Sequence, residues 1–282
     1  MKYLLLIALT LAFRVTLRAQ PAVLVVEDDT IALSANDERR VIERATLYGG
    51  GYTNAYDTYL SPQEYRGVEG RVLRESMRTV RLWGHDYERQ TLFQGNVGYT
   101  HNRVDNNNTI LALVNWSVAW HRSFSVAPGL RLMVGPAVDF NGGFVYNMRN
   151  GNNPAQARAY VNLDAAGMAV YDIRLWGQPF RLRYQLKLPF VGLMFSPHYG
   201  QSYYEIFSVG HTSGIVNLTS LHNQPSLRQM FSIDFPVGRA RMRFAYMCDL
   251  QQSSLHSIDT HTYSHIFMLG FVHRLFRIKN EK

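Results

Sequence analysis

Apolar and polar residues alternate along most of the chain. From about residue 87 onward the dominant period is two, which is the side-chain period of a β-strand. The alternation is complete in residues 180–188, where Phe180, Leu182, Tyr184, Leu186 and Leu188 oppose Arg181, Arg183, Gln185 and Lys187. Comparable segments occupy residues 87–102, 109–123, 130–147, 227–235, 240–250 and 263–275. The pattern predicts an all-β protein.

Strand length separates a membrane barrel from a soluble sandwich, because both alternate. The segments run roughly 9 to 18 residues, whereas ordinary strands have about 5–6 and bilayer-spanning strands need about 9–11. Aromatic residues often stand towards the ends of the apolar faces, as in the interfacial belts of membrane barrels. We therefore predict an antiparallel, up-and-down outer-membrane β-barrel located in the cell outer membrane, with a soluble β-sandwich or jelly roll as the alternative.

The first nineteen residues differ from the rest. Residues 1–19 contain Lys2, an apolar run over residues 3–13 and a short exit ending at Ala19. This arrangement is typical of a secretory signal peptide cleaved before Gln20, and the alternative is a membrane anchor that stays attached. Residues 20–41 are predicted to be a periplasmic segment or a small plug, and residues 42–278 the barrel domain.

Turns and loops suggest a strand count. Short turns are predicted at 127–129, 176–179 and 236–239, and long loops at 103–108, 149–155, 196–201 and 251–261. Short periplasmic turns should alternate with long outer loops, and this requires residues 202–220 to form two strands, 202–209 and 214–220. With two earlier strands near 42–57 and 64–82, the count is about twelve. The membrane face of 64–82 is unclear, because charges occur on both of its faces.

The amino-acid composition excludes several classes of protein and partner. The 282 residues include 29 Lys and Arg, 21 Asp and Glu, and one cysteine, Cys248, which excludes a disulfide scaffold and a thiolate metal site. Loss of residues 1–19 leaves 26 bases and 21 acids, a formal charge of +5. The bases alternate with membrane-facing residues, so we expect outer-membrane lipid and not nucleic acid as a partner. Envelope protein partners are possible and unidentified.

Charged residues on the polar faces are predicted to line the lumen. They are Arg131, Asp139, Asp164, Asp172, Arg174, Arg181, Arg183, Lys187, Arg228, Asp234, Arg241, Arg243, Asp249 and Arg274. One interpretation is an electropositive interior that favours anions. The other, which we favour, is a network of ion pairs that fills a small barrel.

Two His-x-Ser pairs raise an alternative activity. Barrel lipid hydrolases of the phospholipase or lipid A deacylase type use this spacing, because a two-residue step puts base and nucleophile on one face of a strand. The pairs are His211 with Ser213, which the predicted topology puts at a periplasmic turn, and His121 with Ser123. No third member can be placed and the histidines show no metal spacing. We predict a non-enzymatic protein without cofactor or metal.

Three stretches carry a family resemblance: residues 195–207, 223–228 and 260–272. They resemble the domain-of-unknown-function 3316 family of envelope proteins from Bacteroidota, and the resemblance covers about residues 45 to 277. It implies an envelope location and no assigned activity. Within the polar aromatic loop, His198, Tyr199, Tyr203 and Tyr204 are binding candidates. The predicted role is a narrow or plugged channel, or a structural or assembly component of the envelope.

Overall fold

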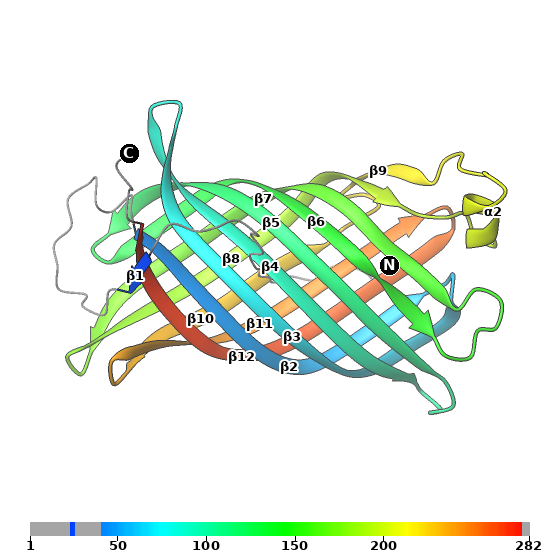
Figure 1. Cartoon of the computed structure of the whole chain (residues 1–282), viewed down its shortest axis with the longest axis horizontal. Helices are drawn as coiled ribbons and strands as arrows, with labels where there is room; N and C mark the ends of the chain where they lie inside the picture. Colours follow the sequence, from blue (N-terminus) through cyan, green and yellow to red (C-terminus); the bar gives the residue numbers. More distant parts are fainter. Residues whose placement is uncertain (1–22, 26–40, 278–282) are drawn as a thin grey trace.

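The protein is a closed antiparallel β-barrel of ten wall strands (Figure 1). The structure is a computed structural model that describes residues 23–25 and 41–277. The wall strands are β2 (Val41–Asp57), β3 (Ser61–Leu82), β4 (His85–Asn102), β5 (Asn108–Ala127), β6 (Leu130–Asn147), β7 (Ala155–Leu175), β8 (Gln178–Phe195), β10 (Leu227–Val237), β11 (Ala240–Leu255) and β12 (Ile258–Arg277). Neighbours in sequence are neighbours in the wall, and pairing of β12 with β2 closes it. The predicted all-β, up-and-down barrel is confirmed.

The N-terminal predictions lie almost entirely outside the described residues. This applies to the signal peptide of residues 1–19 and to most of the segment 20–41. The exception is β1 (Val23–Val25), which pairs antiparallel with the last residues of β12.

The predicted count of about twelve strands is slightly too high, and the difference lies in residues 202–220. The expected strand 202–209 contains instead a short helix, α2 (Tyr203–Phe207). A capping box starts it: the Ser202 hydroxyl accepts a hydrogen bond from the Glu205 amide, and the Ser202 amide donates to the Glu205 carboxylate at 2.5 Å. This local pairing satisfies helix N-terminal amides, and it overrides an alternation too short to specify a strand.

The second expected strand is part of a longer one. Strand β9 (Val216–Ser220) pairs with Val191–Phe195 of β8, and β10 pairs with Arg181–Lys187 of the same strand. The two therefore make a single, interrupted crossing of the wall. The predicted loop 251–261 is also wrong, because β11 and β12 continue to a two-residue turn at His256 and Ser257, both with positive φ.

With ten crossings, the longer connections lie at one end of the barrel, as the sequence predicts, although the same end also carries the two-residue turn 256–257. One end of the barrel carries residues 58–60, 103–107, 148–154, 196–215 and 256–257, and the other carries the turns 83–84, 128–129, 176–177 and 238–239. We call these the long-loop end and the short-turn end. The helix α2 lies at the long-loop end (Figure 1).

The two faces of the wall differ in chemistry. Exposed apolar side chains cover the outside, including Tyr48, Tyr52, Val68, Val72, Val97, Val114, Trp116, Phe140, Phe144, Leu163, Tyr184, Phe231, Phe244, Phe267, Leu269 and Phe271. On β3, whose faces the sequence left unclear, Glu69, Arg71 and Glu75 point inward and Val68 and Val72 point outward. Within the described residues, no helix is long and apolar enough to cross a membrane.

Candidate functional site

Charged side chains fill the barrel interior in two clusters. The first lies towards the short-turn end and is centred on Glu75, which is 2% exposed. Arg183 donates two hydrogen bonds to the Glu75 carboxylate, at 2.5 and 2.8 Å, and Arg243 donates a third. Arg243 also binds both oxygens of Asp234, at 2.5 and 2.7 Å. Glu43 completes this lower cluster by accepting from Arg181 at 3.0 Å and from Arg243 at 3.2 Å.

The second cluster lies towards the long-loop end. Arg71 bonds to Glu69 at 2.7 Å and to Asp249 at 2.6 Å. Arg228 links Asp249, at 3.2 Å, with Asp139. In this upper cluster Asp139 also has the ammonium of Lys187 at 3.7 Å and the Asn115 amide at 2.9 Å. Each guanidinium is therefore held by carboxylates from different strands.

An apolar layer separates the two clusters. On β3, Leu73 stands between Arg71 and Glu75, and on β11, Ala245 and Met247 stand between Arg243 and Asp249. These side chains pack with other fully buried ones in one contact cluster that comprises Leu47, Leu73, Leu92, Met230, Ala245, Met247, Ile266 and Met268. The sequence alternation gave no reason to expect apolar residues on the inner face. They occupy the middle of the lumen with apolar side chains.

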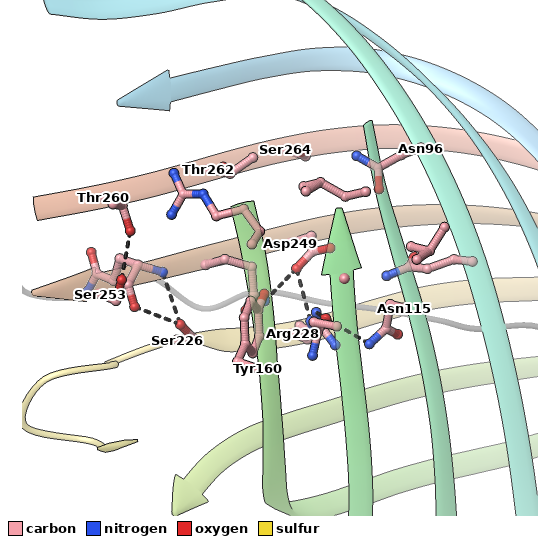
Figure 2. Close-up of a pocket in the computed structure, with 18 of the residues that line it drawn as sticks. Asn96, Asn115, Tyr160, Ser226, Arg228, Asp249, Ser253, Thr260, Thr262 and Ser264 are labelled. Carbon is pink, nitrogen blue, oxygen red and sulfur yellow. Dashed lines mark hydrogen bonds and ion pairs between the residues drawn. The ribbon is translucent and has the colours of Figure 1, made fainter. Parts of the chain in front are cut away.

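A small polar cavity lies above the apolar layer (Figure 2). Its lining is rich in hydroxyl and amide groups, among them Asn96, Asn115, Thr262 and Ser264. Figure 2 shows Arg228 joined to Asp249 by a dashed line at this cavity, which matches their 3.2 Å hydrogen bond. The free volume is about 40 Å³, and a single water needs about 10–15 Å³ on this measure. The cavity has room for a few waters and none for a sugar-sized solute.

Loops fold over the long-loop end. Tyr59 and Leu60 of the β2–β3 loop pack with Leu111, Val145 and Ile258 in a second buried apolar cluster. The Tyr59 hydroxyl donates to the Gln201 carbonyl at 2.8 Å, which ties this loop to the loop that carries α2. Burial, followed by the nearby Tyr203 and Asp57, raises the pKa of Tyr59 to about 12. The phenol stays neutral, and a donor, across the physiological range.

The four loop candidates have different surroundings. Tyr203 lies partly inside the mouth, where its hydroxyl accepts from the Ala157 amide and donates to Gln156, each at 2.7 Å. Tyr199 and Tyr204 are 65% and 70% exposed. His198 stacks on His256 of the β11–β12 turn with ring centroids 4.0 Å apart. Of these four, only Tyr203 forms side-chain hydrogen bonds with the barrel wall, at Gln156 and Ala157 of β7.

The predicted lumen residues all occupy inward positions in the strands, and they divide into two groups. Asp139, Asp164, Arg183, Lys187, Arg228, Asp234, Arg243 and Asp249 are buried inside the barrel. Arg131, Asp172, Arg174, Arg181, Arg241 and Arg274 are partly or fully exposed and lie nearer to the short-turn rim. The two clusters match each carboxylate to a base, and this pairing favours the filled interior over an electropositive one.

Sequence reasoning missed Glu43, Glu69, Arg71 and Glu75, which are central to both clusters. For three of them the signal was present on β3, where Glu69, Arg71 and Glu75 share the odd-numbered face with the buried Leu73. Arginines on the opposite face of the same segment obscured it. The presence of a charge does not by itself show whether a residue lies in the lumen or on the outer face, just beyond the lipid-facing band.

Asp164 is the exception to the pairing. It is 2% exposed, and neither carboxylate oxygen has a hydrogen-bond partner among the described residues. Burying an unpaired carboxylate costs several kcal/mol. Asp164 is thus a destabilising group in the interior when it is ionised.

The His-x-Ser pairs lack the geometry of a catalytic pair. His211 and Ser213 are both exposed in the loop 196–215, at the long-loop end and not at a short turn as the predicted topology required. His121 is buried, with Nε2 3.4 Å from Gln90 Oε1, whereas Ser123 is exposed. Among the described residues, no hydrogen bond joins either histidine to its serine, and no three His, Cys, Asp or Glu side chains form a group able to hold a metal ion.

Comparison with solved structures finds other barrels at low similarity. The transport unit of the autotransporter AIDA-I from Escherichia coli has 11% identity and a TM-score of 0.39, with 86% of this chain and 94% of that chain covered. The translocator domain of NalP from Neisseria meningitidis has 7% identity, a TM-score of 0.38 and coverage of 86% and 90%. An outer-membrane channel from Pseudomonas putida F1 has 10% identity, a TM-score of 0.35 and coverage of 86% and 100%. Similarity this low transfers no function.

No curated protein matches the chain. One family model does match, over residues 3–282, and its description is "Protein of unknown function (DUF3316)".

Proposed function

The chain belongs to the DUF3316 family, and we propose that it is an outer-membrane β-barrel without an open pore, which acts as a closed structural or assembly component of the envelope. The observation that carries this proposal is the filled lumen. Arg183 and Arg243 are 1% and 0% exposed, and Leu73, Leu92 and Met247 are 0% exposed. A conducting barrel needs a continuous aqueous path, and these side chains occupy its place.

The membrane location is supported by the outer surface. Soluble proteins rarely expose contiguous apolar patches larger than a few hundred Å², yet outward-facing positions of neighbouring strands here carry Val68, Val97, Phe140, Phe267 and Leu269, all at least 40% exposed. A closed barrel satisfies its backbone groups within the wall, as a membrane-spanning structure must. Long loops face outward in such barrels, so the long-loop end is assigned to the cell exterior.

Conductance tests the proposal. The purified protein is inserted into a planar lipid bilayer, with a general porin as the positive control for the recording. We expect no stepwise openings from the wild type. Stable wild-type channels that pass small ions would contradict a closed barrel.

A pair of variants tests whether the apolar layer is what closes the lumen. The triple variant Leu73→Ala, Leu92→Ala, Met247→Ala trims that layer, and we expect it to conduct. The matched control Val72→Ala, Phe93→Ala, Phe244→Ala trims outward positions of the same three strands and should stay silent. Silence of both triples would mean that the charge clusters close the barrel without the layer.

A further inference from the structure

The β3–β4 hairpin extends beyond the barrel wall. Among the described residues, β2 pairs with β3 only as far as Met77, and β4 pairs with β5 only from Glu88 onward. Residues 80–87 pair only within the hairpin, while Arg78 and Thr79 pair with Arg89 and Glu88, where β4 still pairs with β5. Figure 1 shows this hairpin leaving the barrel at the short-turn end and standing away from the long axis of the barrel.

The hairpin has one apolar face and one polar face. Val80, Leu82 and Tyr87 continue the outward face of the wall, since they share its two-residue period and Val80 pairs with Tyr87. On the other face, Thr79 donates a hydrogen bond to Glu88 at 3.0 Å. When a wall hairpin bends away from the barrel axis, its outward face turns towards the bilayer and its inward face towards water. The apolar face is therefore the one presented to lipid.

A strained tryptophan forms the tip. Trp83 has φ 48°, Gly84 has φ 80°, and the Trp83 side chain is 88% exposed. A two-residue hairpin turn with both φ values positive normally takes Asn-Gly, because a bulky residue in the left-handed region costs about 1–2 kcal/mol. Such an outlier at an exposed position suggests that the tip is kept for a function other than stability.

The same turn occurs twice. Residues 81–84 and 174–177 both read Arg-Leu-Trp-Gly, and both turns lie at the short-turn end. Trp176 also has positive φ and is 90% exposed. Its ring packs edge-on against that of the outward-facing Phe180, with the ring centroids 6.4 Å apart. Trp176 thus lies at the border of the lipid-facing band. Tryptophan is the residue that prefers this headgroup level.

Arginines mark the point where the β3–β4 hairpin leaves the wall. Arg74, Arg78 and Arg89 follow Val72 and Phe93 on the outward face of β3 and β4, just beyond the apolar band. Guanidinium groups bind phosphates well, and long basic side chains at the edge of a bilayer reach its headgroups. Their position complements the anionic surface of a membrane leaflet.

We propose that residues 78–89 form a membrane-surface anchor that lies along the inner leaflet of the outer membrane. Trp83, Val80, Leu82 and Tyr87 enter the interfacial region, and the arginines at its base contact lipid phosphates. The partner is thus the phospholipid surface itself. This inference rests on the proposed outer-membrane location.

Tryptophan fluorescence tests the anchor, since the chain has four tryptophans. A protein that keeps only Trp83 (Trp116→Phe, Trp120→Phe, Trp176→Phe) is reconstituted into vesicles of brominated phosphatidylcholine, with and without phosphatidylglycerol. We expect Trp83 to lose most of its emission to the lipid bromines and to be protected from aqueous iodide. A protein that keeps only Trp116, which is outward-facing in the wall and stacked on Phe140, reports insertion of the barrel.

The outcomes separate the two proposals. If Trp116 is quenched by bromolipid while Trp83 is not and remains open to iodide, the hairpin lies in water and the anchor is wrong, although the membrane barrel stands. If neither is quenched, the outer-membrane location fails as well.

A second experiment tests the arginines. In the protein that keeps only Trp83, Arg89→Gln should reduce the additional quenching that phosphatidylglycerol gives. Arg81→Gln, on the polar face of the hairpin, should not, and equal effects of the two changes would refute the phosphate contact.

Discussion

Glu75→Gln should destabilise the barrel strongly, because Glu75 is at the centre of the lower charge cluster. The carboxylate accepts hydrogen bonds from Arg183, Arg243 and Gln90. Without it, the one acid left within 4 Å of Arg183 among the described residues is Glu43, at 3.8 Å. Unit charges about 4 Å apart attract by about 4 kcal/mol at the effective dielectric suited to proteins. Because Arg183 would stay buried with little compensation, we expect a loss of about 3–5 kcal/mol, the usual cost of breaking a buried pair.

The measurement is urea unfolding of the barrel in lipid vesicles, followed by tryptophan fluorescence at neutral pH. The control is Asp172→Asn, which removes an acid that is 40% exposed and bound to Arg181 at 2.6 Å. Exposed pairs contribute about 0–1 kcal/mol, so this variant should unfold almost as the wild type does. If the two variants lose the same small amount, the interior network does not stabilise the barrel and the argument from burial is wrong.

A double variant separates the carboxylate from its guanidinium. Glu75→Leu with Arg183→Met replaces one buried pair by apolar side chains, and such replacements are often neutral or stabilising. We expect it to recover part of the stability lost in Glu75→Gln, with the remaining loss due to Arg243. No recovery at all would mean that the damage comes from altered packing and not from the uncompensated charge.

Three further outcomes follow from the interior and from α2. Leu73→Ala should lower the unfolding free energy by about 2–5 kcal/mol, the range for large-to-small changes in packed cores, in the same urea titration. Asp164→Asn should leave stability unchanged or raise it at neutral pH, because the carboxylate it removes has no hydrogen-bond partner among the described residues; a loss comparable to that of Glu75→Gln would show that Asp164 has a partner. Hydrogen bonds from Ser202 lower the pKa of Glu205 below its ordinary 4.5. The stability that Glu205 gives α2 is therefore present above that ordinary value and is lost as pH falls through the lowered one. Amide hydrogen exchange of α2 should speed up in Glu205→Gln at neutral pH but remain unchanged in Asp259→Asn, a change at the start of β12 at the same end of the barrel.

The filled interior also explains the unusual charge pattern of the sequence. Arginines on the inner faces of β8, β10 and β11 are costly inside a barrel unless each has an acid. The acids come from distant parts of the chain: Glu75 and Arg183 are 108 residues apart, and Arg228 and Asp139 are 89 apart. The wall must close before these pairs can form, so the network stabilises the completed barrel and not its parts.

The alternation of side chains by itself determined the fold class and the inward charges of β6 to β12, because a strand has a period of two and only one of its faces can meet lipid; it did not identify those of β2 and β3. Periodicity fails where local chemistry dominates, as in α2, where a capping box outcompetes a short alternating segment. It also carries no information about which strand lies opposite. The number of wall crossings, the partners of Glu75 and Asp139, and the apolar layer of Leu73, Leu92 and Met247 were decided by the closed tertiary structure. Closure brings side chains from distant strands into one small lumen, where volume and charge must both balance.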